Sequence, residues 1–326
     1  MSCPDGYHVR PVTADDLDRV VELLNHDARA VTGFPVTWRA LLKASWESPA
    51  VELGNDMFVV VEDASGDVVA YSELFGSEPY VDPIIIGCVD PHHLGRRLGS
   101  FLIEEGARRA ERFVAKAPPD RAVVLRVGSF EEHDSARAVL RRAGCTLVRR
   151  FPLMRRDFVG IVEVSPLPEG LELRSFAAGR EARTVYDTHV EAFDDHFGEG
   201  HPTFESWSHD LITSDGALFD PDLWLLAWDR DELAGLAIAA DDVPLFPGYG
   251  YVLSLGVRRP WRSRGLGLAL LTAVFARIQA KGARGALLNV DAESQTGANR
   301  LYERAGMRQT PDYVIWERPI RPAIPG

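Results

Sequence analysis

The residues of this chain best suited to chemistry lie in a short turn between a strand-like segment, 251–257, and a long amphipathic segment. The turn consists of Arg262, Ser263, Arg264, Gly265, Leu266, Gly267 and Leu268. Glycine permits backbone angles at which successive N–H groups form a concave nest for an anion, and a following helix adds partial positive charge. With two arginines beside it, this turn is expected to bind a diphosphate-bearing cofactor.

Other phosphate-binding motifs do not fit these residues. A dinucleotide-binding turn requires a third glycine where this chain has Leu270, and the Gly-Lys-Ser/Thr of a P-loop does not occur. The glycines alone would also suit an ordinary loop before a helix. A second feature makes the assignment of a cofactor site more specific. Tyr302 follows Gly267 by 35 residues and belongs to segment 301–306, whose pattern predicts a helix that ends at Gly306.

The glycine turn, the Tyr302 segment and their separation together resemble the GCN5-related N-acetyltransferase (GNAT) family, which uses acetyl-CoA. The likeness is close over about 150 residues of the C-terminal half and degenerate over the N-terminal half. It implies an α+β fold with a mixed sheet, acetyl-CoA as co-substrate and no metal. It also implies that acetyl-CoA contacts the backbone of Leu255, Gly256 and Val257, and Ser294, which stands where many relatives have Asn.

Acetyl transfer from a thioester to an amine requires a neutral amine, hydrogen-bond donors for the developing oxyanion, and a proton for the leaving thiolate. The resemblance places Tyr302 beside the CoA sulfur as the general acid. Without it, Tyr302 would be read as a packed aromatic residue whose hydroxyl reaches water. The general base stays open among Asp241, Asp242, Asp291, His196 and a water chain to solvent.

Composition limits the other functions that this chain could have. With 326 residues and 46% hydrophobic composition, the chain can bury one large core or two ordinary ones. It has no run of 18 apolar residues, no apolar leader, and three widely spaced cysteines without metal or redox spacing. A net charge of −12 argues against nucleic acid or an anionic membrane as partner. We expect a cytoplasmic protein.

The charge is concentrated in residues 187–242, which carry fifteen carboxylates and one basic residue, Arg230. A solvated surface is the ordinary explanation of such a run. The functional alternative is that part of this field lines an acceptor cleft and attracts a cationic amine.

Three blocks of the sequence recur in the same order. Segments 9–17, 89–99 and 136–144 match segments 173–181, 257–267 and 298–306, at offsets of 164, 168 and 162. Two prolines and a glycine make segment 161–170 a suitable linker. The prediction is two tandem GNAT-type domains: 1–160, degenerate and structural, and 171–326, catalytic. The chain would be a monomer, as a pseudo-dimer of its two domains, or a homodimer.

Each half is expected to contain strands, a long helix, a further strand, a short helix and a closing hairpin. Apolar runs and turn signals predict the following elements: strands at 57–62, 67–75, 84–89 and 122–127 with a helix at 99–114, and strands at 223–228, 233–240 and 286–290 with a helix after Gly267 that ends at Gly282. Leu266, Leu270, Val274 and Ile278 form the expected buried face of the second helix.

The two halves differ at the residues that would act. Leu94, Arg97 and Leu140 stand at the positions of Arg262, Gly265 and Tyr302. The N-terminal half therefore lacks the side-chain cation, one turn glycine and the phenol, which predicts a structural role.

Among tandem members of the family, the chain most resembles the mycothiol synthase type, with two departures. That type carries a catalytic Glu where this chain has Tyr251, and an acceptor-site Lys where it has Ala239 and Ala240. We therefore expect a small-molecule N-acetyltransferase with a different, cationic acceptor. Mycothiol synthase-like activity, acetylation of a protein or peptide amine, and a non-catalytic acyl-CoA-binding module are the alternatives.

Overall fold

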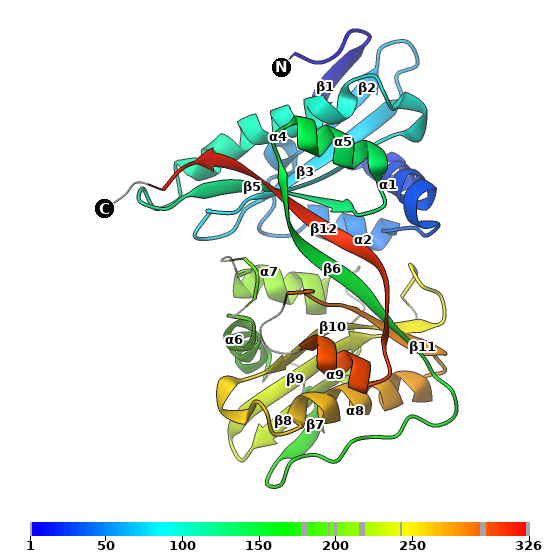
Figure 1. Ribbon diagram of the computed structural model, residues 1–326, viewed down its shortest axis with the longest axis vertical. Coiled ribbons are helices and arrows are strands. Elements are labelled where there is room, and N and C mark those ends of the chain that lie inside the picture. The colour runs from blue at the N-terminus through cyan, green and yellow to red at the C-terminus, as the bar shows by residue number, and fades with distance from the viewer. Residues whose placement is uncertain are drawn as a thin grey trace. The chain divides into compact units, whose positions relative to one another are not determined.

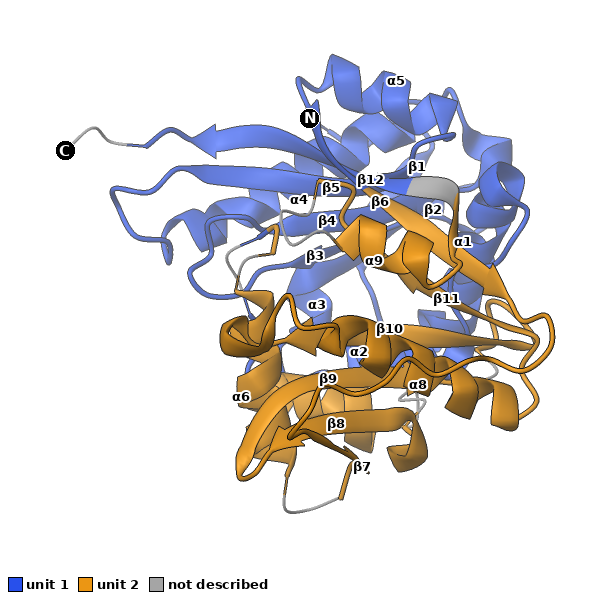
Figure 2. Ribbon diagram, turned by 60° about the horizontal axis from the view of Figure 1, so that its bottom comes forward, with its two compact units in different colours: residues 1–150, 198–203, 311–326 blue, residues 151–197, 204–310 orange. Residues whose placement is uncertain are grey.

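The computed structural model describes residues 2–177, 181–194, 196–198, 201–214, 219–241, 243–293 and 298–323, without the side chains of 310–312. The chain forms two compact units (Figures 1 and 2). Unit 1 comprises residues 1–150, 198–203 and 311–326, and unit 2 comprises 151–197 and 204–310. Among the described residues, no helix is long and apolar enough to cross a membrane.

Unit 1 is a mixed sheet with helices on its faces. Its strand order is β1-β2-β3-β4-β5-β12, and only the β4–β5 pair is parallel among its described pairings. The strands are β1 Tyr7–Pro11, β2 Met57–Glu62, β3 Val68–Phe75, β4 Ile84–Val89, β5 Val123–Phe130 and β12 Arg308–Arg321, and the helices are α1 Leu17–Thr32, α2 Arg39–Trp46, α3 Leu53–Asp56, α4 Leu98–Val114 and α5 Asp134–Arg142.

Unit 2 has the same plan. Its strand order is β6-β11-β10-β9-β8-β7, again with one described parallel pair, β10–β11. The strands are β6 Thr146–Asp157, β7 Glu172–Ser175, β8 Trp224–Asp229, β9 Glu232–Ala240, β10 Tyr249–Val257 and β11 Gly285–Asn289, and the helices are α6 Ala182–Phe193, α7 Phe204–Ser208, α8 Leu266–Ala280 and α9 Ala298–Arg304. The mixed sheets confirm the predicted α+β class.

The boundary between the units does not fall at the predicted linker. The last strand of each half of the sequence pairs with the sheet of the other unit. β12 pairs antiparallel with β5 of unit 1, whereas β6 pairs antiparallel with β11 of unit 2. Where a closing hairpin was expected, each half has one long strand. Segment 161–170 is fixed along α8, because the backbone N–H of Ser165 donates to Thr272 Oγ1 at 2.9 Å and that of Val162 donates to Gln279 Oε1 at 2.9 Å.

Candidate active site

The glycine turn of unit 2 adopts the conformation that an anion nest requires. Ser263 and Gly265 both have positive φ, 62° and 88°, and α8 begins directly after them. A Cβ built on Gly265 would meet no atom within 4 Å, so glycine is favoured here by its backbone angle and not by a lack of space. Residues 263–265 are exposed, which leaves their N–H groups and the helix N-terminus open to a ligand.

The two arginines of the turn have different environments. Arg262 folds back onto the main chain, with Nε donating to the Val257 carbonyl at 2.9 Å and an Nη donating to the Ala192 carbonyl at 3.1 Å. Arg264 is exposed and makes no hydrogen bond or ion pair with the residues that the structure describes. Arg262 therefore braces the turn against β10 and α6, and Arg264 is the cation that faces solvent.

β10 opens away from its neighbour as it approaches the turn. It pairs with β11 only from Tyr249 to Tyr251, while it stays paired with β9 as far as Val257. A β-bulge lies between Val252 and Ser254. The β11-facing edge of β10 after Tyr251 is therefore the edge where an extended ligand could bind by main-chain hydrogen bonds. It includes the predicted contacts Leu255, Gly256 and Val257.

Two glycines of the predicted site permit close packing. A Cβ on Gly256 would lie 2.9 Å from Ala192 Cβ, at the end of α6. A Cβ on Gly267 would lie 2.8 Å from Leu301 Cδ1, so the first turn of α8 abuts α9. This contact brings Tyr302, the neighbour of Leu301, to the turn.

Tyr302 is 8% exposed, and burial raises the pKa of its phenol to about 12. Within the described part of the chain, no group hydrogen-bonds to its hydroxyl. The phenol keeps its proton at neutral pH, as a general acid must.

The candidates for the base lie in different places. Asp291 follows β11 at the splayed end of the sheet; it is 7% exposed, and its Oδ1 accepts the Glu293 N–H at 3.0 Å. Asp241 is near Lys281, at the other end of α8. The pKa of Lys281 is raised mainly by its hydrogen bond to Asp220 and to a smaller extent by the charge of Asp241. His196 is exposed, with its ring 4.3 Å from that of Phe193. Asp242 and Ser294 lie outside the described residues.

Three polar side chains that are linked at β10 were not found by the sequence reasoning. The Trp207 indole N–H donates to His189 Nδ1 at 2.9 Å, so neutral His189 carries its proton on Nε2. Nε2 lies 3.5 Å from Oγ of Ser254, which is 8% exposed and directly follows the bulge. Ser254 accepts this long hydrogen bond and keeps its own O–H as a donor. No short motif links these three residues, which lie on α6, α7 and β10.

Tyr251 occupies the position where the resembled type has a catalytic Glu. Its hydroxyl donates to Asn289 Oδ1, and burial raises its pKa to about 12. A phenol in this state is a poor proton acceptor near neutral pH.

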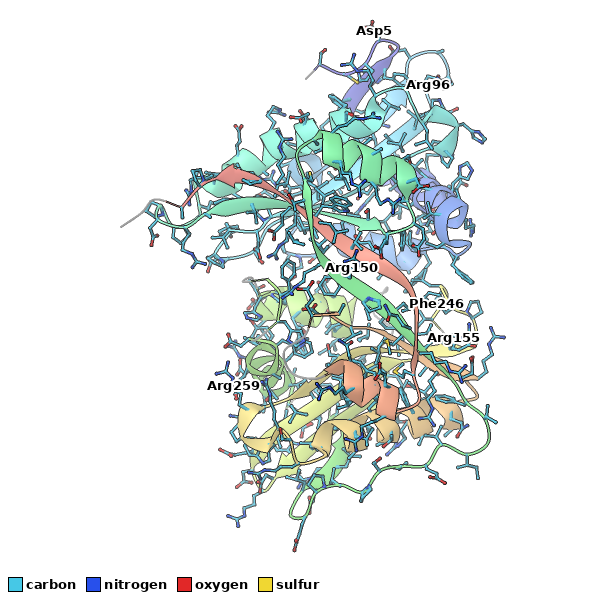
Figure 3. All side chains as sticks on the ribbon, viewed as in Figure 1. Asp5, Arg96, Arg150, Arg155, Phe246 and Arg259 are labelled. Atoms are coloured by element: carbon cyan, nitrogen blue, oxygen red, sulfur yellow. The ribbon has the colours of Figure 1, made fainter. Side chains whose placement is uncertain are left out.

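Part of the acidic run is neutralised locally. Glu191 pairs with Arg258 at 2.7 Å. Asp194 pairs at 3.6 Å with Arg259, which is labelled in Figure 3, and Asp220 pairs with Lys281 at 2.5 Å. The first two pairs reduce the net negative field beside the turn, and the third does so at the other end of α8.

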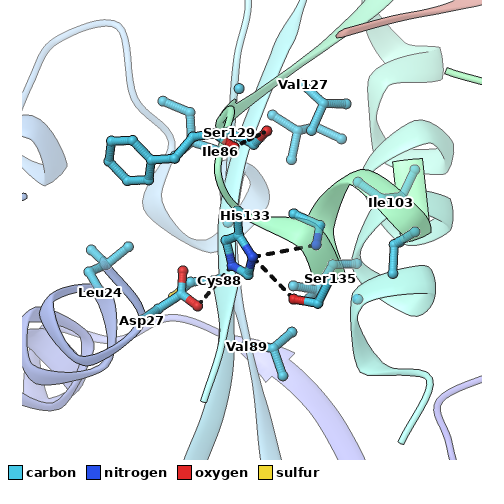
Figure 4. A pocket seen from close by; sticks show the side chains of 18 of the residues that line it. Leu24, Asp27, Ile86, Cys88, Val89, Ile103, Val127, Ser129, His133 and Ser135 are labelled. Carbon is cyan, nitrogen blue, oxygen red and sulfur yellow. Dashed lines mark hydrogen bonds and ion pairs between the residues drawn. The ribbon is translucent and has the colours of Figure 1, made fainter. Parts of the chain in front are cut away.

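Unit 1 contains a cavity of about 650 Å³ at the corresponding place. Its walls include β4 and β5 where these strands separate, the turn before α4, and the inner sides of α1 and α5. Figure 4 shows the lining residue His133 between Asp27 and Ser135, with Nε2 3.1 Å from Asp27 Oδ1 and Nδ1 3.1 Å from Ser135 Oγ. Glu73 also lines the cavity; burial raises its pKa to about 7, although the Tyr71 hydroxyl donates to it at 2.7 Å.

The turn of unit 1 keeps the nest conformation without Gly265's counterpart. Gly95 has φ 78° and Arg97 has φ 69°, matching Ser263 and Gly265. The arginine adopts a left-handed conformation that L-residues rarely use.

Comparison with known proteins agrees with this architecture. Residues 183–307 match the model of the acetyltransferase (GNAT) family. The mycothiol acetyltransferase of Streptomyces scabiei is 32% identical over 250 residues, 74% of this chain and 73% of its own length. That of Geodermatophilus obscurus is 30% identical over 87% of this chain and 88% of its own. The chain belongs to the GNAT family.

Solved structures share this fold over nearly the whole chain. A GCN5-related N-acetyltransferase from Sphaerobacter thermophilus matches with a TM-score of 0.79 and 31% identity over 99% of this chain and 98% of its own. A tandem GNAT protein from the clavulanic acid pathway shares the fold, with a TM-score of 0.70 and 17% identity over 98% of this chain and 99% of its own. The protein is therefore an N-acetyltransferase with the tandem GNAT fold, and acyl-CoA is the family's co-substrate.

Proposed function

We propose that unit 2 transfers the acetyl group of acetyl-CoA to the primary amine of a small, cationic molecule. The observation that carries this proposal is the convergence of three elements at one end of the unit 2 sheet: the exposed turn 263–265, the open edge of β10 and α9 with Tyr302. The diphosphate lies at the turn, with Arg264 as the solvent-facing cation. The pantetheine arm pairs with the β10 edge from Leu255 to Val257.

The reaction is direct attack of the neutral amine on the thioester carbonyl. Ser254, oriented by Nε2–H of His189, donates its hydroxyl hydrogen bond to the carbonyl oxygen as that oxygen gains charge. Tyr302 gives its proton to the departing thiolate. Burial supports both roles, because the two hydroxyls lie where water competes little for their hydrogen bonds.

Asp291 accepts the amine's proton in this scheme. Its support is its position at the splayed end of β11 and its burial. A water chain is the competing route, and Asp291→Asn separates the two. A fall in kcat of about 10²–10⁴-fold with acetyl-CoA affinity unchanged supports Asp291, and a wild-type kcat in Asp291→Asn assigns proton removal to water.

The curated relatives are mycothiol acetyltransferases, but Tyr251, Ala239 and Ala240 replace the Glu and Lys that the resemblance expects. A different acceptor follows from these substitutions. The deciding experiment measures CoA release with polyamines, aminoglycosides, amino acids, peptides and the cysteinyl sugar–inositol amine as acceptors. Turnover with a small cationic amine supports the proposal. Turnover restricted to peptides or to the mycothiol precursor refutes the acceptor class, and acetyl-CoA binding without turnover would make unit 2 a binding module.

A further inference from the structure

His26, Asp90 and His92 bring three metal-ligating side chains together in unit 1. His26 lies on α1, Asp90 follows β4, and His92 belongs to the short 3-10 turn Pro91–His93. One ligand atom of each residue lies within 4.8 Å of the other two. None of the three residues belongs to the acetyl-CoA site proposed for unit 2.

Two of the three ligands stand on a fixed backbone. The Asp90 N–H donates to the Val69 carbonyl at 2.8 Å, and Asp90 Oδ1 accepts the His92 N–H at 2.9 Å. Asp90 is only 6% exposed. Its second oxygen, Oδ2, lies 3.7 Å from Nδ1 of His26. The two imidazoles are exposed, so their side chains can turn toward a shared ion without disturbing the core.

The strand-to-turn junction of unit 2 that matches Asp90 carries a different charge. Arg258 occupies the position of Asp90, and it is held by Glu191 of α6 at 2.7 Å. Unit 1 has an acidic side chain on the turn and an imidazole on the neighbouring helix. In unit 1, a bound cation would provide the positive charge that Arg258 provides in unit 2. Arg19 provides part of it, with an Nη 3.7 Å from Asp90 Oδ2.

We infer that His26, Asp90 and His92 form a binding site for a divalent transition-metal ion. Two imidazoles and one carboxylate, with water in the fourth position, match the ligand set that Zn²⁺ accepts. Tetrahedral bonds of about 2.0–2.2 Å place ligand atoms roughly 3.3–3.5 Å apart. The His26–Asp90 separation of 3.7 Å is close to this value, and rotation of the exposed His side chains closes the remaining distance.

The test is calorimetric titration of the full chain with Zn²⁺ after treatment with a chelator, with Co²⁺ as a spectroscopic probe. One ion per chain and a tetrahedral Co²⁺ spectrum are expected. His26→Ala and His92→Ala should each weaken binding by more than about 100-fold, because loss of an outer-shell partner alone costs 10–100-fold. His8→Ala is the matched control, since His8 is an exposed histidine of the same unit paired with Asp63.

Arg19→Gln gives an independent prediction of opposite sign. It removes the cation that competes for Asp90 Oδ2, so Zn²⁺ binding should tighten by about 10-fold, the scale of an outer-shell effect. The inference is overturned if Zn²⁺ does not bind at millimolar concentration, or if it binds equally to wild type, His26→Ala and His92→Ala. Thermal unfolding without metal verifies that each variant folds. The Co²⁺ spectrum of the wild type and the Arg19→Gln titration decide the matter if a histidine variant does not fold.

Discussion

Tyr302→Phe is the substitution that most directly examines the chemistry of unit 2, because it removes one hydroxyl and leaves the ring in place. Burial raises the pKa of this phenol to about 12. At pH 8 the protonated form therefore outnumbers the phenolate by about 10⁴ to 1. General acid catalysis contributes typically 10²–10⁴-fold, so kcat should fall by that factor. This loss corresponds to roughly 3–5 kcal/mol in the activation free energy.

The fold should tolerate the change. Within the described part of the chain, no residue hydrogen-bonds to the Tyr302 hydroxyl, so the substitution leaves no partner unsatisfied. We expect the free energy of unfolding to change by less than about 1 kcal/mol. Acetyl-CoA affinity, measured by calorimetry, should also stay within a few-fold of wild type. A fall in kcat then reports lost chemistry and not lost protein.

The pH profile supplies the refutation. The wild-type kcat should rise as the acceptor amine loses its proton and should then stay level to about pH 11, because the Tyr302 pKa is about 12. CoA release measured from pH 7 to pH 10.5 examines this range. If Tyr302→Phe keeps kcat within about 3-fold of wild type throughout, Tyr302 is a packing residue. An alkaline fall near pH 9 that persists in the variant would assign the proton to another group.

Three further outcomes are expected. Gly265→Asp should abolish acetyl-CoA binding in calorimetry, whereas Gly265→Asn, which also tolerates positive φ but carries no charge, should retain most of it; equal loss in both would indicate backbone strain. Glu73→Gln should raise the free energy of unfolding of unit 1 by about 1–3 kcal/mol in urea at pH 8, but not at pH 4.5. The reason is that burial raises the pKa of Glu73 to about 7 in the folded state, so the carboxyl of the wild type lowers stability as pH rises from about 4.5 to 7. An equal effect at both pH values would contradict this. If unpaired carboxylates of segment 187–242 steer a cationic acceptor, kcat/KM should decrease between 0.02 and 0.5 M salt, roughly as exposed charges are screened; a salt-independent value would leave them as surface charge.

The local elements could be read from the sequence because their signals are local. The strand expected at 84–89 is Ile84–Val89, and the helix expected at 99–114 is Leu98–Val114. The exchange of closing strands could not be read in this way. β6 and β12 carry the same kind of pattern, and their choice of β11 and β5 as partners depends on contacts far away in the chain.

Helix α8 shows a second limit of local patterns. Periodicity predicted one buried face through Leu266, Leu270, Val274 and Ile278, and all four are buried. Leu271 and Phe275 are also fully buried, and the linker residues Val162 and Ser165 are fixed along the same helix by hydrogen bonds to Gln279 and Thr272. A coil segment without periodicity gives no sign in the sequence that it will cover a helix.

The number of glycines in a turn does not predict whether its backbone adopts the nest conformation, as the two turns show. Each turn has two positive-φ positions, and glycine occupies a different one in each: Gly95 in unit 1 and Gly265 in unit 2. The missing glycine at Arg97 therefore did not remove the backbone nest. The Arg262 guanidinium bonds to the main-chain carbonyls of Val257 and Ala192, so its replacement by Leu94 also removes a brace of the turn.

Of the three differences noted between the halves, the exchange of Tyr302 for Leu140 is the one that removes a proton donor. The backbone of unit 1 still offers a nest beside a cavity of about 650 Å³ that Glu73 lines. Leu140 is 2% exposed and cannot donate a proton. Unit 1 thus combines the nest conformation and a cavity with the loss of the phenol. The Tyr302→Phe variant of unit 2 measures how much rate that single hydroxyl contributes.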